Sequence, residues 1–122
     1  MKKKVLIIDD EPSIAELTAF FLTEAGCETT HFTSSRKALA CLRSQDFDVL
    51  VSDIRMPEMS GIEMLNYLIA DQIELPKKII FVTGFSIDIE EKQKDSNWPR
   101  VAVLHKPVEF SELVKVVLAL GE

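Results

Sequence analysis

Cysteine and long apolar runs are both scarce in this chain of 122 residues, whose two thiols are Cys27 and Cys41. Their spacing forms no motif, so we expect two buried, reduced thiols in a cytoplasmic protein. No segment approaches the roughly 18 consecutive apolar residues that a membrane helix needs. The apolar stretch after the N-terminal lysines is too short for a signal peptide. These absences predict a protein with no membrane partner.

Basic residues are also fewer than acidic ones. The chain has 14 Lys and Arg residues and 20 Asp and Glu residues, which gives a formal net charge of −6. The one basic run is Lys2-Lys3-Lys4. Tight binding to duplex DNA requires clustered cations at the phosphates, so we expect no direct nucleic-acid contact by this chain. The length and the 47% hydrophobic content are those of one ordinary globular domain.

The chain alternates short β-branched runs with longer stretches of helical periodicity. This alternation predicts an α/β fold, in which five parallel strands joined by right-handed helical crossovers form a doubly wound (βα)5 sandwich of three layers. The expected strands are 5–8, 28–32, 49–52, 78–82 and 101–104. The expected helices are 12–25, one capped by Ser34 or Ser35 and running to residue 42, 61–70, a weak and polar 87–95, and 109–120.

Two of these helices carry detailed expectations. In the first, Pro12 suits the first helical position and Gly26 the position after the last turn. We expect one inward face there, made mostly of Ile14, Leu17, Phe20, Phe21 and Leu22. The last helix has too many apolar residues for one buried stripe, so Val116 or Leu120, together with Val103, is expected to form an exposed partner patch.

Chemically capable side chains follow four of the five predicted strands. Asp9 and Asp10 end the first strand, Asp53 the third, Thr83 the fourth and Lys106 the fifth. The carboxyl ends of parallel strands lie on one edge of a sheet, so these groups are expected to converge.

Three carboxylates brought together repel one another and raise one another's pKa. A hard divalent cation relieves this repulsion, and Mg²⁺ favours a few carboxylates together with water and phosphate oxygens. The ammonium of Lys106 and the hydroxyl of Thr83 would complete a cradle for a phosphoryl group. The set predicts in-line phosphoryl transfer, with Asp53 as the nucleophile.

These residues resemble a known family over the whole chain. The set Asp9-Asp10, Asp53 with Met56-Pro57-x-x-x-Gly61 after it, Thr83 and Lys106-Pro107 is similar to the receiver domain of two-component response regulators. The resemblance implies a single receiver domain over residues 1–122 with a flavodoxin-like fold. It also implies a phosphorylation-dependent signalling switch, with self-phosphorylation from phosphodonors and autodephosphorylation as its only intrinsic reactions.

The resemblance assigns a role to each matching position. Asp53 looks like the phosphoacceptor for a sensor histidine kinase or phosphotransfer protein. Asp10 resembles a direct Mg²⁺ ligand, Asp9 a ligand through water, and the backbone carbonyl of Arg55 a third metal contact beside Asp53. Thr83 and Lys106 resemble the groups that bind the phosphoryl oxygens. The Lys106-Pro107 bond is expected to be cis, since only bonds before proline make cis inexpensive.

Three positions depart from the pattern or tune it. Many receivers have Tyr or Phe where this chain has Val103, and the stiff valine side chain cannot make a large rotamer swing. Phe85 and Arg55 stand where the family tunes hydrolysis of the phosphoaspartate. We hypothesise that Phe85 shields the acyl phosphate from water.

The resemblance places the output on the surface of helix four, strand five and helix five. The expected partners are a downstream effector protein or a fused output domain, and a phosphorylation-linked homodimer is left open. So is the choice between a stand-alone regulator and a receiver from a longer protein.

Three alternatives remain open. A haloacid-dehalogenase-like phosphohydrolase also uses a strand-end aspartate, although it needs Asp-x-Asp rather than the adjacent Asp9-Asp10. A flavin binder would need a phosphate loop without these acids. A degenerate receiver would signal without phosphorylation. His31 and His105 are not expected to form a metal site.

Overall fold

The computed structural model describes residues 2–84 and 101–119. Within these ranges it contains five strands in one parallel sheet, ordered β2-β1-β3-β4-β5. The strands are β1 (Lys4–Ile8), β2 (Glu28–Phe32), β3 (Val49–Asp53), β4 (Lys78–Thr83) and β5 (Val101–His105). The predicted strands are confirmed to within one residue at each end, and so is the doubly wound parallel sheet. The predicted helix 87–95 lies outside the described residues.

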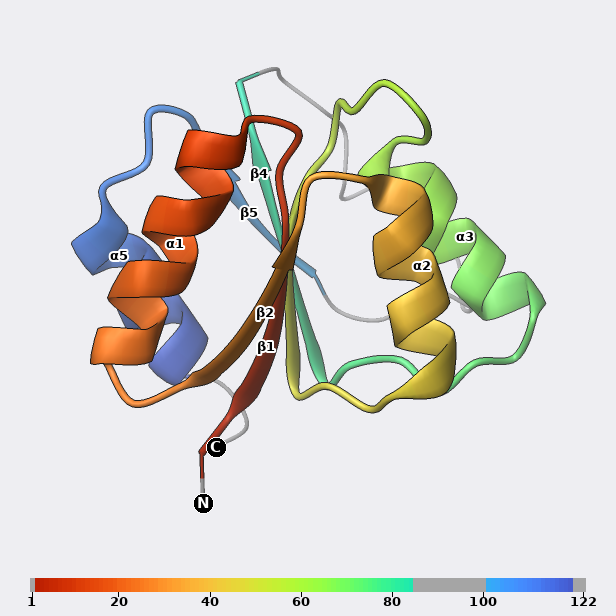
Figure 1. The fold of residues 1–122 in the computed structure, drawn as a ribbon, viewed down its shortest axis with the longest axis horizontal. Coiled ribbons are helices and arrows are strands. Elements are labelled where there is room, and N and C mark those ends of the chain that lie inside the picture. The colour runs from red at the N-terminus through yellow and green to blue at the C-terminus, as the bar shows by residue number, and fades with distance from the viewer. Residues whose placement is uncertain (1, 85–100, 120–122) are drawn as a thin grey trace.

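Four described helices cover the two faces of the sheet. They are α1 (Pro12–Glu24), α2 (Ser35–Ser44), α3 (Gly61–Ala70) and α5 (Phe110–Leu118). α1 and α5 lie on one face and α2 and α3 on the other, while the loops after β1 and β3 leave the upper edge of the sheet (Figure 1). No helix among the described residues is long and apolar enough to cross a bilayer.

Local signals explain where the helices begin and end. Pro12 occupies the start of α1, and Gly26 has a positive φ of 99° just after the helix, as predicted. The Oγ of Ser34, rather than Ser35, accepts a hydrogen bond from the backbone N–H of Lys37 and caps α2. Ser60 and Glu63 form a reciprocal capping box at the start of α3.

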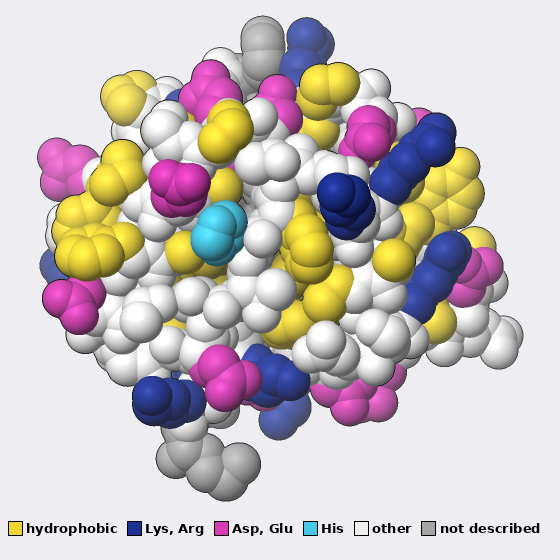
Figure 2. Space-filling view, in the orientation of Figure 1, with side chains coloured by type: hydrophobic (Ala, Val, Ile, Leu, Met, Phe, Trp, Pro, Cys, Tyr) yellow, Lys and Arg dark blue, Asp and Glu magenta, His cyan; other side chains and the backbone are white. Residues whose placement is uncertain are grey.

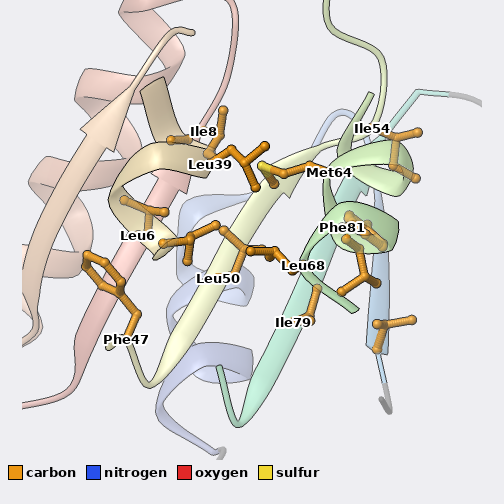
Figure 3. Packing of buried hydrophobic residues seen from close by; sticks show 14 residues of the cluster. Leu6, Ile8, Leu39, Phe47, Leu50, Ile54, Met64, Leu68, Ile79 and Phe81 are labelled. Carbon is orange, nitrogen blue, oxygen red and sulfur yellow. The ribbon is translucent and has the colours of Figure 1, made fainter. Parts of the chain in front are cut away.

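Each face of the sheet has its own core. The larger cluster lies between the sheet and the α2–α3 layer and includes Leu6, Leu50, Met64, Leu68 and Phe81, which point toward one another (Figure 3). The smaller cluster lies beneath α1 and α5. Because the central strands are covered on both sides, they read as continuous apolar runs.

α1 turns a different face inward from the one that its large apolar residues suggest. Its buried residues are Ala15, Thr18, Ala19 and Leu22, whereas Leu17, Phe20 and Phe21 are exposed by 44%, 56% and 38%. The prediction that these three face inward was therefore wrong. Small side chains let the helix backbone lie close to the sheet, and the Thr18 hydroxyl is satisfied by donating to the carbonyl of Ile14 at 2.7 Å.

An apolar surface is visible on the side of the molecule that carries α1. Hydrophobic side chains gather at the left margin of the molecule, on the side of α1 and α5 (Figure 2). The ring of Phe21 stacks on that of Phe110 from α5 with centroids 4.8 Å apart.

Of the predicted partner patch, the pair Val103 and Val116 does not form one surface. Val103 packs against the cluster on the α2–α3 side, whereas Val116 packs against the cluster beneath α1 and α5. Both are half-buried, and the two faces of the sheet separate them. Leu120 lies outside the described residues.

The burial pattern of α1 predicts opposite outcomes for two leucines of one helix. Leu22→Ala removes a fully buried side chain and should lower the free energy of unfolding by about 3 kcal/mol. Leu17→Gln, at an exposed position with little change in helix propensity, should change it by less than about 0.5 kcal/mol. Chemical denaturation measures both, and a larger loss for Leu17→Gln would contradict the assigned face.

Candidate functional site

The register of the sheet brings the predicted site residues to one edge. Ile8 pairs with Ser52, Asp53 with Val82, and Thr83 with His105. Asp9 and Lys106 each follow the last residue of a strand, and the backbone N–H of Lys106 donates to the carbonyl of Thr83 at 2.8 Å. The strand ends therefore lie side by side, as the sequence predicts for a parallel sheet.

Three carboxylates meet at this edge. Asp9, Asp10 and Asp53 each offer an oxygen, and these atoms lie within 4.8 Å of one another. Asp9 and Asp53 are only 6% and 8% exposed, while Asp10 faces solvent. An all-oxygen donor set with an open side fits a hard divalent cation such as Mg²⁺.

The ammonium of Lys106 supplies positive charge to this cluster. Its Nζ donates to Oδ2 of Asp53 at 2.9 Å and lies 3.6 Å from Oδ2 of Asp9. Burial by itself lowers the pKa of Lys106, but the hydrogen bond to Asp53 and the attraction of both carboxylates raise that pKa above its ordinary value. Lys106 therefore stays charged and partly neutralises the two buried acids.

The surroundings of Asp9 disfavour its ionised form. Burial raises its pKa, and the nearby charges of Asp53 and Asp10 raise it further. The hydrogen bond that its Oδ1 accepts from the backbone N–H of Glu11 at 2.9 Å lowers the pKa, as does Lys106, but both together only partly offset burial. The bond to Glu11 also fixes the carboxylate at the entrance to α1.

The remaining predicted residues have varied surroundings. Thr83 is 1% exposed at the end of β4, and the Arg55 side chain points to solvent. The peptide bond between Lys106 and Pro107 is cis, as predicted. Val103 is half-buried in the α2–α3 cluster, and Phe85 lies outside the described residues.

The structure shows a steric reason for glycine at position 61, which the sequence motif did not reveal. A Cβ at this residue would lie 2.6 Å from the backbone carbonyl oxygen of Asp53 and 3.0 Å from the ring of Phe81. The same carbonyl accepts a hydrogen bond from Ser52 Oγ at 2.7 Å. The start of α3 therefore packs directly against the backbone of Asp53, which only glycine permits.

A cavity of about 420 Å³ opens beside the carboxylates, between the start of α1, the β5–α5 loop and the sheet. Asp9, Asp53 and Lys106 form its polar rim, and side chains such as Ile14, Val108 and Phe110 form its apolar wall. No sequence pattern points to this cavity, because its wall comes from segments about 90 residues apart.

The electrostatics of Asp9 predict that function and stability oppose each other there. An acid with a raised pKa in the folded state destabilises the fold when ionised, and this penalty disappears as the pH falls through the raised pKa. Without added metal, Asp9→Asn should raise the free energy of unfolding by roughly 1 kcal/mol near pH 7, a common gain at functional positions.

That gain should shrink as the pH is lowered, because the wild-type Asp9 then takes up a proton in the folded state. Denaturant titrations of both proteins from pH 7 to pH 4 measure the difference. A less stable Asn variant at pH 7, or a gain independent of pH, would contradict the description of Asp9.

Comparisons with known proteins all point to the same family. The family model of the response regulator receiver domain matches residues 5–118. The response regulator receiver protein CpdR of Brucella abortus is 35% identical over 116 residues, which cover 94% of this chain and 93% of CpdR. The transcriptional regulatory protein FixJ of Bradyrhizobium diazoefficiens is 31% identical over 116 residues, which cover 95% of this chain and 55% of FixJ.

Solved structures agree with the sequence relatives. The receiver domain of Francisella response regulator 1452 superposes with a TM-score of 0.83 at 28% identity, covering 98% of this chain and 96% of that one. The chemotaxis protein CheY4 of Vibrio cholerae gives a TM-score of 0.82 at 27% identity, covering 98% and 99%. The family match sets aside the phosphohydrolase and flavin-binding alternatives. The chain belongs to the receiver domains of two-component response regulators.

Proposed function

We propose that Asp53 accepts a phosphoryl group from a phosphohistidine of a sensor kinase or phosphotransfer protein, in a reaction that requires Mg²⁺. The observation that supports this best is the cluster itself. Three carboxylate oxygens lie within 4.8 Å of one another, and the Lys106 ammonium is 2.9 Å from Asp53. Asp10, Asp53 and the Arg55 carbonyl would hold the metal directly, and Asp9 would hold it through water.

The transfer step is a nucleophilic substitution at phosphorus. An oxygen of the Asp53 carboxylate attacks, its new bond to phosphorus forms, and the bond from phosphorus to the donor's imidazole nitrogen breaks with its electron pair leaving on the imidazole. A bound Mg²⁺ would neutralise charge on the carboxylates and the phosphoryl oxygens. Lys106 stays protonated throughout and turns from the carboxylate to the new phosphoryl oxygens.

Phosphorylation would change the charge at Asp53 from one negative charge to nearly two. We propose that Lys106 and the Thr83 hydroxyl follow the added oxygens, which shifts the loops after β4 and β5. Val103 cannot supply the side-chain swing of an aromatic residue, so the change would reach the surface of helix four, β5 and α5 through the backbone.

The proposed setting is signalling in the cytoplasm, by the whole chain as one receiver domain. Its output would pass to an effector protein or a fused output domain, with a phosphorylation-linked homodimer as one form of that output. Apart from transfer from the partner's phosphohistidine, autophosphorylation from small phosphodonors and autodephosphorylation would be its only intrinsic reactions. Phe85 would slow the second by excluding water from the acyl phosphate.

The proposal is tested by incubating the protein with acetyl phosphate and Mg²⁺ and measuring intact mass. We expect one added phosphoryl group, no addition to Asp53→Asn, and loss of addition when EDTA removes the metal. A wild-type protein that gains no phosphoryl group would identify a degenerate receiver. Addition that persists in Asp53→Asn would contradict the assignment of the phosphoacceptor.

A further inference from the structure

We infer that Glu58 is a positioning residue: it fastens the β3–α3 loop to the N-terminus of α2 and so keeps the Arg55 carbonyl beside the metal-binding carboxylates. This inference rests on the proposed function, because it concerns the Mg²⁺ site. Nothing in the site motif points to Glu58, which lies between Pro57 and Met59 in a segment that the family resemblance leaves variable.

The loop of residues 54–60 is fixed firmly at its two ends. The backbone N–H of Gly61 donates to the carbonyl of Ile54 at 2.8 Å, which closes the loop at its base. Gly61 also packs against the carbonyl of Asp53. Between these ends Met56 and Met59 are half-buried and pack against the α2–α3 cluster, whereas Arg55, Pro57 and Glu58 are exposed. Burial therefore holds only one side of the loop, and its polar side depends on other contacts.

Glu58 ties this middle to another element. Its Oε1 accepts a hydrogen bond from Ser34 Oγ at 2.6 Å and a longer one from the backbone N–H of Arg36 at 3.4 Å. Ser34 Oγ in turn accepts from the backbone N–H of Lys37 at 3.2 Å. The Ser34 hydroxyl therefore caps α2 and also donates a hydrogen bond to Glu58. This bond links the loop to the helix, although the two residues are 24 positions apart in the sequence.

The charge of α2 explains why a carboxylate suits this position. The start of a helix carries partial positive charge, and acids there are stabilising. None of the residues that the structure describes in the first turn of α2 is acidic, whereas Arg36 and Lys37 are basic. The bonds to Ser34 and Arg36 lower the pKa of Glu58, so it is ionised wherever the proposed site works. Glu58 therefore places a negative charge at the start of α2, where the helix has no acidic residue of its own in the first turn.

The fastened loop adjoins the carboxylate cluster. Asp10, Ser34, Met56 and Glu58 line one hollow of about 270 Å³, so the tie and an exposed carboxylate of the cluster share a single pocket. Arg55 lies two residues after Asp53 and three before Glu58. A loop freed from α2 would let the Arg55 carbonyl move away from the cluster, which weakens metal binding without touching a carboxylate ligand.

Calorimetric titration with Mg²⁺ tests the inference with three variants. Glu58→Ala should raise the dissociation constant roughly tenfold, the lower end of the effect of groups that orient metal ligands. Glu58→Gln keeps an oxygen that can accept from Ser34 and Arg36, and it should remain within about twofold of wild type. Glu16→Ala, which removes an exposed acid from α1, should leave affinity unchanged and controls for net charge.

If Glu58 acted only by attracting the cation through its charge, Gln and Ala would weaken binding equally, and that result would overturn the inference. So would a Glu58→Ala protein with wild-type affinity. The rate of labelling by acetyl phosphate gives a second readout. With Glu58→Ala it should fall at limiting Mg²⁺ and recover at saturating Mg²⁺, which a general loss of folding would not produce.

A double-mutant cycle with Ser34→Ala locates the effect. Removing both partners of one hydrogen bond should weaken Mg²⁺ binding little more than removing Glu58 alone. Additive losses would show that the two residues act separately. A wild-type protein that binds no Mg²⁺ would contradict the proposed function itself, whereas normal wild-type binding with an unaffected Glu58→Ala variant would overturn only the role of Glu58.

Discussion

The arrangement depends on the attraction between the Lys106 ammonium and the two buried carboxylates. Asp9 and Asp53 are almost fully removed from solvent at adjacent strand ends, which is unfavourable for ionised groups without a partner. Lys106 contacts both from the end of β5, two strands away from β3 in the sheet. Its charge lets the fold hold these acids close together in the absence of metal, and it is also the charge that a phosphoryl group would attract.

The surrounding elements bring these charges together from distant parts of the chain. The parallel sheet aligns four strand ends on one edge, and the glycine at the start of α3 lets that helix approach the backbone of Asp53. The loop after β3 is closed at its base by Gly61 and fastened in its middle by Glu58. The core positions Asp53 and holds Met56 and Met59 of the loop beside it, while polar contacts at the surface fasten the exposed side of that loop.

Much of the fold and the membership of the site follow from sequence patterns. The β-branched runs locate the strands, Pro12, Ser34 and Gly61 locate helix starts, and the strand-end rule brings Asp9, Asp53 and Lys106 together. These signals are local or follow from topology. The inward face of α1 could not be read in this way, because the small side chains of Ala15 and Ala19 decide how closely the helix lies on the sheet.

The other failures are also matters of tertiary packing. The pairing of Ser34 with Glu58 joins two loops and has no spacing signature. Val103 and Val116 were grouped by their apolar character, yet the sheet lies between them.

We propose that Asp53 carries the phosphoryl group and that Mg²⁺ held by the carboxylate cluster makes this possible. Reduction of the acetyl-phosphate-treated protein with borohydride converts a phosphoaspartate to homoserine, and peptide sequencing by tandem mass spectrometry then locates it. We expect homoserine at position 53 when Mg²⁺ is present and unmodified aspartate when the metal is chelated. Homoserine at another residue, or equal conversion with and without Mg²⁺, would contradict it.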